Sequence, residues 1–322
     1  MKIDAHMHVN FKGKSHRGII QYLDRNRFDS CWLMSWEEMA PHPDPKLYRH
    51  LSIEAIYEAY TQYPDRIIPM YAPDPHREDA SERLVYWHGK GIRGCAELKA
   101  TLNWHTENVR KLLCTASNLG IPVVFHMEES IKILVALKSD SELGAFLVRL
   151  FRSNRLFGSP RILFNILKVC TPFLKRWEAN RTFLTPGYML DFTSLAKALR
   201  DFTDLRFVGH GPLFWKNISS PTVPDEPIYP KGPIKEEGLT CQFLRDYNNL
   251  YADISGYSGF NALNRDHDFA RKFLSGFSHK ILFGTDNENI GLEKLVESFN
   301  LSSEAKRKIY GENAIAMINK CS

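Results

Sequence analysis

Short apolar stretches alternate with longer amphipathic ones along most of the chain. Helical patterns of apolar residues cover Ser52–Tyr63, Asn108–Leu119 and Asp191–Phe202, each with a polar start or a Gly or Pro stop. Eight other stretches have the β-favouring composition of buried strands: Lys2–His8, Asp29–Ser35, Ile67–Ala72, Ile92–Lys99, Pro122–Met127, Leu205–His210, Leu250–Ser255 and Ile281–Asp286. Alternating strands and helices indicate parallel βαβ units, and eight such units predict an α/β fold, a closed (β/α)8 TIM barrel.

Two connections are too long to be simple crossovers. The first, residues 128–187, follows the fifth strand, and we expect a helical cap inserted into a single barrel domain of residues 1–322. The second, Gly211–Gly238, follows the sixth strand and contains six prolines, which predicts a long surface loop. Both would leave the barrel at its C-terminal face, where the active sites of this fold lie.

The expected cap carries a basic stretch. From Arg149 to Arg181, eight lysines and arginines stand against one acidic residue, Glu178, and they are interleaved with Leu, Phe and Trp. This pattern favours basic amphipathic helices with a solvated outer face. A lid, a dimer contact and the attraction of an anionic substrate are the functional alternatives.

Composition excludes several classes of protein. A 43% hydrophobic content and a net charge of +5 are ordinary for a globular enzyme and too weakly basic to indicate nucleic-acid binding. We find no signal peptide and no apolar run of membrane-spanning length, so we expect a cytoplasmic protein. Six scattered cysteines predict reduced thiols. Neither a Walker-type loop nor a Gly-x-Ser-x-Gly elbow is present, which disfavours P-loop and serine-esterase chemistry.

Candidate metal ligands stand at the ends of five predicted strands. His6 and His8 form a His-x-His pair, which places both imidazoles on one side of the first strand, where they can hold one cation. Because strand ends converge in a barrel, we expect this pair to meet the other ligands. Those ligands are Glu97, His126, His210 and Asp286.

The order of these motifs resembles the amidohydrolase superfamily, in particular the amidohydrolase-related branch that includes aminocarboxymuconate semialdehyde decarboxylase. The matching motifs are His-x-His, Val-Val-Phe-His-Met, Phe-Val-Gly-His-Gly and Ile-Leu-Phe-Gly-Thr-Asp. The resemblance implies that His6, His8 and Asp286 bind metal. It also implies that His126 binds metal or stands beside it, and that His210 binds a second ion or polarises the substrate.

The fourth strand departs from the pattern of the branch. Many superfamily members have a lysine there that becomes a bridging carbamate, and the decarboxylase branch typically has no ligand at that point. In this chain Glu97 could bridge two ions directly, whereas Lys99 has the same strand parity and would need to be carbamylated. Glu97 could instead pair with Lys99 or Arg93. A bridging carboxylate favours two metals and hydrolysis.

This composition suits a metal-dependent hydrolase. A divalent ion lowers the pKa of a bound water towards about 7, and a second ion can polarise the scissile bond. We expect Asp286 to move the proton and His210 to assist. The ion is expected to be Zn²⁺, one or two per chain, with Mn²⁺ or Fe²⁺ as alternatives. Candidate substrate-binding residues in the loops are Lys99, Trp104, Trp215 and Tyr257.

We predict hydrolysis of a C–N or ester or lactone bond in a small cyclic or carboxylated substrate. The alternative is a zinc-dependent non-oxidative decarboxylase with a single ion. A third hypothesis, an inactive barrel whose basic cap binds a partner or a membrane surface, does not explain why the ligands are kept together. The expected partners are a small-molecule substrate and a second copy of the chain, with no nucleic acid and no membrane span.

Overall fold

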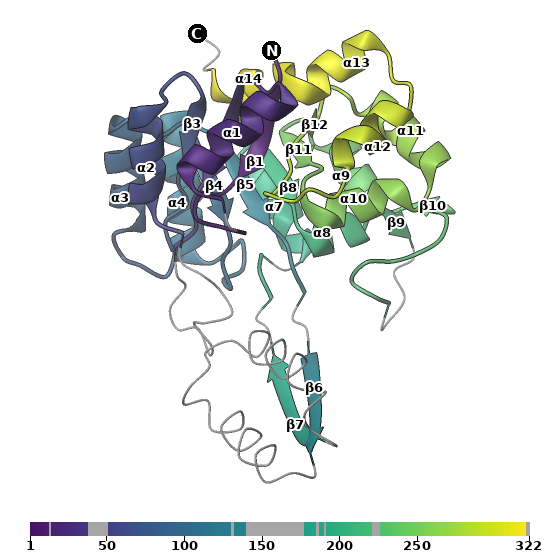
Figure 1. Cartoon of the computed structure of the whole chain (residues 1–322). Helices are drawn as coiled ribbons and strands as arrows, with labels where there is room; N and C mark the ends of the chain where they lie inside the picture. The colour runs from purple at the N-terminus through teal and green to yellow at the C-terminus, as the bar shows by residue number, and fades with distance from the viewer. Residues whose placement is uncertain are drawn as a thin grey trace. The chain divides into compact units, whose positions relative to one another are not determined.

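The computed structural model describes residues 1–12, 14–37, 51–129, 187–189, 191–220 and 226–319, together with the backbone of 132–139 and 177–184 (Figure 1). The chain divides into two compact units. Unit 1 comprises Met1–Glu37, His50–Glu129 and Tyr188–Ser322, and unit 2 comprises Glu38–Arg49 and Ser130–Gly187. Every candidate site residue named above belongs to unit 1.

Eight strands in the described part of unit 1 pair in parallel, and each lies within one of the predicted stretches. They form a three-stranded sheet, β1-β2-β3, and a five-stranded sheet, β4-β5-β8-β11-β12. The strands are β1 Ile3–Met7, β2 Ser30–Met34, β3 Ile67–Met70, β4 Cys95–Leu98, β5 Val123–His126, β8 Phe207–His210, β11 Leu250–Asp253 and β12 Ile281–Leu282.

Backbone hydrogen bonds join the edges of the two sheets. The Tyr71 N–H donates to the Gly94 carbonyl at 2.9 Å, which links β3 to β4. The Ala5 N–H donates to the Phe283 carbonyl at 2.8 Å, which links β1 to the end of β12. The eight strands are therefore connected all the way round, as the α/β prediction expects, and their C-terminal ends meet on one side.

One apolar cluster fills the space inside the strands. Tyr251 of β11 packs against it. The buried members of the cluster come from seven strands and from the helix α14, Asn313–Ile318: Ile3, Ala5, Trp32, Met34, Met70, Ala96, Val124, Val208, Leu282, Ala314 and Met317. The register shifts in β1 and in β4. Because of the shift in β1, Ala5 lies in the core and the next residue, His6, lies in the polar site. In a strand with regular alternation, these two side chains would point to opposite faces of the sheet.

Helices flank the strands (Figure 1). Their starts follow capping chemistry: Ser52 accepts a bond from Ala55 N–H at the start of α2, and Asp191 accepts one from Thr193 N–H at the start of α7. The helices are α1 His16–Asn26, α2 Ile53–Gln62, α3 Ala80–Gly89, α4 Glu107–Leu119, α7 Phe192–Asp201, α8 Pro212–Lys216, α9 Leu239–Asp246, α10 Gly256–Asn264, α11 His267–Gly276, α12 Leu292–Ser298, α13 Ser303–Arg307, the π-helix η2 Lys308–Glu312 and α14 Asn313–Ile318.

The described backbone of unit 2 is a pair of strands and not the expected helices. β6 Lys132–Ser139 and β7 Trp177–Leu184 pair antiparallel, with Lys132 opposite Leu184. Lys132–Ser139 contains a run of five apolar residues between two lysines, and a short apolar run of this kind suits a strand as well as a helix. These two stretches are strands where we expected a helical cap. Residues 140–176, which carry most of the basic stretch, lie outside the described residues, and the helices predicted there stay a prediction.

The proline-rich connection is only partly a surface loop. It opens with the five-residue helix α8, whose Phe214 and Trp215 are buried, and short strands β9 Ser219–Ser220 and β10 Glu236–Glu237 pair antiparallel. Pro212 sits at the first helical position, where its missing N–H does no harm. In the described part of the chain, no helix has both the length and the apolar character that crossing a bilayer requires. Cys31, Cys95, Cys114 and Cys241 are free thiols.

Candidate metal centre

His6 and His8 face each other at the C-terminal end of β1. Their Nε2 atoms are 3.1 Å apart, and both side chains are fully buried. His8 Nδ1 lies 2.9 Å from the Met34 carbonyl, which can only accept, and His6 Nδ1 lies 2.5 Å from an Asp253 carboxylate oxygen. Both Nδ1 atoms therefore donate outwards, which turns the Nε2 atoms toward one point. Two lone pairs this close require a proton or a cation between them.

The electrostatics of the pair agree with this geometry. Burial opposes charge on His6, but the Asp253 carboxylate raises the pKa of His6 to about 9. Burial, and then the positive charge of His6, lowers the pKa of His8 to about 4. In the metal-free protein, the pair therefore holds one proton over most of the pH range, and a metal ion would take that proton's place.

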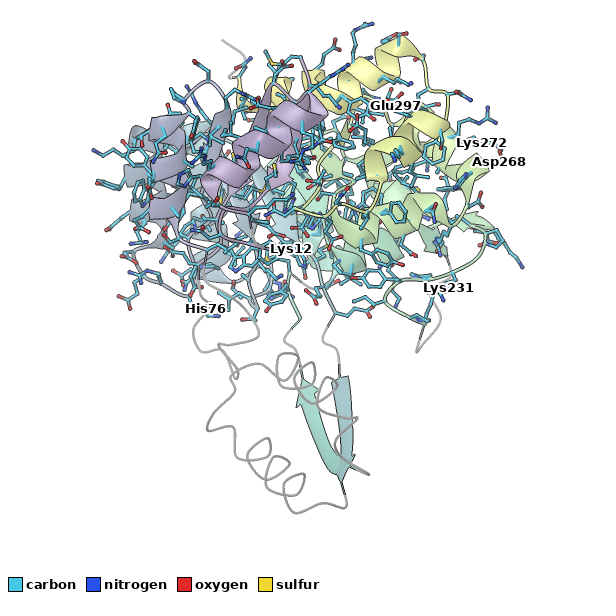
Figure 2. The ribbon with its side chains drawn as sticks, viewed as in Figure 1. Lys12, His76, Lys231, Asp268, Lys272 and Glu297 are labelled. Carbon is cyan, nitrogen blue, oxygen red and sulfur yellow. The ribbon has the colours of Figure 1, made fainter. Side chains whose placement is uncertain are left out.

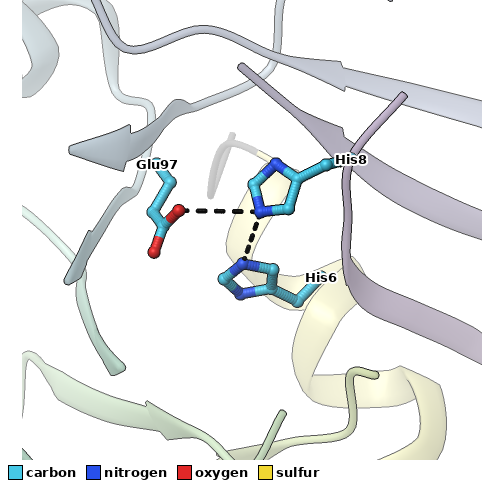
Figure 3. Close-up of side chains that lie close together, drawn as sticks. All are labelled: His6, His8 and Glu97. Carbon is cyan, nitrogen blue, oxygen red and sulfur yellow. Dashed lines mark hydrogen bonds and ion pairs between the residues drawn. The ribbon is translucent and has the colours of Figure 1, made fainter. Parts of the chain in front are cut away.

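Glu97 divides its two carboxylate oxygens between two groups of histidines. Its Oε2 lies 3.6 Å from His8 Nε2, and Figure 3 shows Glu97, His8 and His6 converging. Its Oε1 lies 2.7 Å from His126 Nδ1 and 4.0 Å from His210 Nε2. Burial alone would raise the pKa of Glu97, but the charge and hydrogen bond of His126 hold that pKa well below its usual value. An ionised, buried carboxylate with its oxygens so divided can bridge two cations.

Two sets of ligand atoms share Glu97. In the first set, one atom each from His6, His8 and Glu97 lies within 4.8 Å of the others, and the second set, Glu97, His126 and His210, has the same spacing. The residues of both sets are buried. Burial, followed by the charge of His6, lowers the pKa of His210 well below its usual value, so the imidazole is neutral and able to bind metal. Imidazole and carboxylate are donors that zinc, manganese and iron accept, so the residues fit such a group.

Asp286 completes the first set from the segment after β12. Its Oδ1 lies 3.6 Å from His8 Nε2, and its N–H donates to the His6 carbonyl at 2.9 Å. The side chain is 20% exposed, more open than the buried ligands, so solvent can reach it. Lys12 Nζ lies 3.2 Å from Oδ2 of Asp286 and 2.8 Å from Glu288 Oε1. The structure thus brings all six sequence-predicted ligands together.

Asp253 orients the histidines from behind. Its Oδ2 contacts His6 Nδ1 and accepts the Ser255 hydroxyl proton at 3.0 Å, and the Ser255 oxygen lies 3.1 Å from His210 Nδ1. Asp253 lies at the end of the predicted strand Leu250–Ser255, where it could either support the site or contact the substrate. A second buried acid, Asp4, is not among the sequence-predicted residues: it accepts hydrogen bonds from Thr285 N–H and Oγ1–H, which ties β1 to the segment after β12. Neither role has a sequence signal, because both depend on contacts between strands distant in sequence.

The four predicted substrate-binding residues lie in different surroundings. Lys99 Nζ lies 5.0 Å and 4.9 Å from the ring centroids of Trp36 and Tyr188, and its side chain is 10% exposed. Tyr257 is 46% exposed. A substrate contact for these two stays a prediction.

The two predicted tryptophans are core residues by their contacts. Trp104 is fully buried, and its ring lies 4.8 Å from the Phe125 ring. Trp215 is 2% exposed and donates from Nε1 to the Asp253 carbonyl at 2.9 Å. Trp215 supports the site through Asp253, whereas Trp104 packs in the core. Contact with a substrate stays a prediction for both tryptophans.

Comparison with known proteins agrees with this arrangement. The model of the amidohydrolase family matches residues 3–320. The chain belongs to the amidohydrolase family. With the buried histidine and carboxylate cluster, this membership identifies a metal-dependent enzyme. A search of curated proteins found no match.

Solved structures share the fold at low sequence identity. A probable 2-pyrone-4,6-dicarboxylic acid hydrolase from Acinetobacter baumannii, with citric acid bound, is 16% identical over 98% of both chains, with a TM-score of 0.52. A 2,6-dihydroxybenzoate decarboxylase from Rhizobium is 15% identical over 98% of both chains, with a TM-score of 0.50. A dihydroxybenzoic acid decarboxylase from a Polaromonas species, with manganese and 2-nitroresorcinol bound, is 14% identical over 98% of this chain and 96% of that one, with a TM-score of 0.51. At these identities the likeness extends to the fold alone.

Proposed function

We propose that this amidohydrolase is a hydrolase that holds two divalent cations and cleaves an ester, lactone or C–N bond in a small carboxylated substrate. The observation that carries the proposal is the division of the Glu97 oxygens, Oε2 toward His8 and Oε1 toward His126. A carboxylate whose two oxygens face two groups of histidines suits a bridge between two ions. His6, His8, Glu97 and Asp286 would hold one ion. Glu97, His126 and His210 would hold the other.

Such ions supply Lewis-acid chemistry, lowering the pKa of water and polarising the bond to be cleaved. Asp286 is the proton carrier: it is the most open carboxylate of the set, and it takes the proton of the attacking water and returns it to the leaving group. His210, held at Nδ1 by the Ser255 hydroxyl, presents its Nε2 to the second ion or to the substrate. The Lys99 ammonium, between two aromatic rings, would hold a substrate carboxylate.

Two observations support the proposed substrate class, the description of one structural neighbour and the side chains beside the site. The neighbour described as a pyrone dicarboxylic acid hydrolase acts on a cyclic, carboxylated compound, which suits a site with a lysine and aromatic rings beside it. Zn²⁺ is our first choice of ion, and Mn²⁺, found in one neighbouring structure, is the second. The cytoplasmic location expected from the sequence stays a prediction.

The second candidate function is decarboxylation with one ion. The observation that favours it is the number of structural neighbours described as dihydroxybenzoate decarboxylases. The two functions differ in ion count and in products. Metal analysis of the protein, reconstituted with Zn²⁺ or Mn²⁺, should give close to two ions per chain, and a panel of carboxylated lactones should yield ring-opened acids. One ion per chain with release of CO₂ from a hydroxybenzoate panel would overturn the proposal in favour of the decarboxylase.

Asp286→Asn tests the proton carrier. The amide keeps the shape of the side chain but cannot take a proton, so we expect kcat to fall by about 10²–10⁴-fold, the usual contribution of general acid–base catalysis. Circular dichroism and thermal melting should be unchanged. Wild-type kcat in this variant would refute the role of Asp286.

A further inference from the structure

Glu128 is a carboxylate at the metal centre that the ligand set does not use. It lies two residues beyond His126, and its Oε2 is 3.0 Å from His126 Nε2. The side chains of Glu128 and His126 are 17% and 11% exposed. Lys99 Nζ lies 3.8 Å from the same oxygen. The carboxylate therefore faces two groups with positive character, one on each side.

Both ring nitrogens of His126 face carboxylate oxygens, which only accept, so in the metal-free protein the Nε2–H donates to Glu128 and the Nδ1–H donates to Glu97 Oε1 at 2.7 Å. Nδ1 lies on the side of the second set of ligand atoms, and a cation there would replace its proton while the Nε2–H stays on Glu128. One ring nitrogen on a fixed partner thus leaves the other nitrogen for a cation. The other three histidines follow the same rule, since each has one ring nitrogen on a fixed partner: Asp253 for His6, the Met34 carbonyl for His8 and the Ser255 hydroxyl for His210.

The backbone holds Glu128 in place. Glu128 N–H donates to the Tyr188 carbonyl at 3.1 Å, and Tyr188 N–H donates back at 2.8 Å. One residue earlier, the Met127 N–H donates to the His210 carbonyl at 2.9 Å. The carboxylate is thus carried by a segment that is hydrogen-bonded on both sides, and its reach to His126 does not depend on a free loop.

We propose that Glu128 is the positioning residue of the second cation site: it holds His126 with Nδ1 turned toward Glu97 and His210, and Lys99 offsets its charge. The proposal rests on the proposed two-ion function for its effect on metal binding. The orientation of the His126 ring does not depend on that function, so the two can be tested separately.

The first experiment titrates metal-depleted protein with Co²⁺ alone and follows its visible absorption, which reports ligand geometry. Glu128→Leu should weaken the second binding event by about 10–100-fold, as loss of an outer carboxylate partner does, and leave the first event unchanged. Glu128→Gln keeps an acceptor oxygen but not its charge, so its affinity for the second ion should lie between that of the wild type and that of Glu128→Leu. The matched control is Glu129→Gln, because Glu129 pairs with Lys216 at 3.1 Å. It should bind both ions as the wild type does.

The proposal would be overturned if Glu128→Leu bound both ions as the wild type does, or if it lost affinity equally for both. If Glu128→Leu fails to fold, a wild-type titration of Glu128→Gln would overturn the proposal. The second experiment needs no metal. In ¹⁵N-histidine-labelled apoprotein, the His126 Nε2–H should give a slowly exchanging signal that Glu129→Gln keeps, Glu128→Gln shifts and Glu128→Leu loses. If the wild type binds one cobalt only, the two-ion function fails, and this signal still decides the role of Glu128: an unchanged signal in both Glu128 variants would refute it.

Discussion

At the scale of single residues, the site is an arrangement of charges that cancel only in part. His6, His8 and Glu97 are fully or almost fully buried, and each reaches an opposite charge or a hydrogen-bond partner. Buried charges without partners are costly, so the cluster is stable only when bound protons or cations balance its buried negative charge. The site depends on pH because the number of protons held by the His6–His8 pair changes with pH.

Metal affinity should rise with pH. The pKa of His6 is raised to about 9 and that of His8 is lowered to about 4, so between these values the metal-free pair carries one proton that a cation must displace. Each pH unit in that window should therefore raise the apparent affinity for Zn²⁺ or Co²⁺ about tenfold. Calorimetry in buffers of different ionisation enthalpy should count about one proton released per first ion. A pH-independent affinity would contradict the assignment of the proton to this pair.

Lys12 (Figure 2) is the cation that holds the open carboxylate in place. Lys12 Nζ lies between Asp286 Oδ2 and Glu288 Oε1, so Lys12→Met leaves two carboxylates side by side and frees the Asp286 side chain to turn. We expect kcat to fall about 10–100-fold. The free energy of unfolding should change by less than about 1 kcal/mol, because the pair is partly exposed.

Lys12→Arg should restore part of the activity lost in Lys12→Met. Lys231→Met, at an exposed lysine, serves as the control and should behave as the wild type. Steady-state kinetics with chemical denaturation checks both quantities. An unchanged kcat in Lys12→Met would show that Asp286 is held by its backbone alone.

At the scale of elements, the close approach of β12 to β1 sets the position of His6. A Cβ added at Gly284 would lie 2.7 Å from the His6 Cβ and 3.0 Å from Asp253 Oδ1. One atom belongs to His6, a candidate ligand of the first ion, and the other belongs to Asp253, which orients the His6 ring. A glycine is therefore required where the two strands meet, just before the Thr285-Asp286 ligand segment.

Gly284→Ala should weaken both the fold and the site. Overpacking of this kind costs about 1–3 kcal/mol of unfolding free energy. Displacement of the His6–Asp253 pair should lower the affinity for the first ion about 10–100-fold. Gly276→Ala, at the end of α11, is the control, because nothing lies within 4 Å of its added Cβ. It should leave metal affinity unchanged, and equal effects of both alanines would argue against the close approach.

Elements also show where sequence reasoning succeeded and where it could not. Alternation of apolar strands and amphipathic helices was enough to locate β1 to β5, β8, β11 and β12, and strand ends were enough to predict which candidate ligands lie close together. The register shifts in β1 and β4 have no signal in hydrophobic alternation, because they are set by the neighbouring strands. The burial of Trp104 and Trp215 could not be predicted either, because a loop and a five-residue helix are too short to show a period that separates core aromatics from pocket aromatics.

At the scale of the whole molecule, the chain is a site-bearing unit interrupted by a second compact unit. All the ligands, with Asp253, Lys12 and Glu128, lie in unit 1. At the longer of the two interruptions of unit 1, the chain leaves and re-enters at neighbouring points, since Glu128 and Tyr188 pair through two backbone hydrogen bonds. A short linker can therefore span the gap if the segment between them is removed.

Replacing residues 131–186 with a short Gly-Ser linker should leave unit 1 folded and able to bind metal. The linker closes a small gap at little cost in loop entropy, and no ligand is removed. We expect cooperative thermal unfolding and wild-type ion content, checked by melting and metal analysis, together with lower turnover if the segment acts as the predicted cap. Sedimentation velocity of both proteins tests the predicted homodimer, because a dimer built through the cap would dissociate in the variant. Loss of bound metal from a folded variant would show that the inserted segment supports the site directly. The distances among the candidate ligands in unit 1 do not require such support.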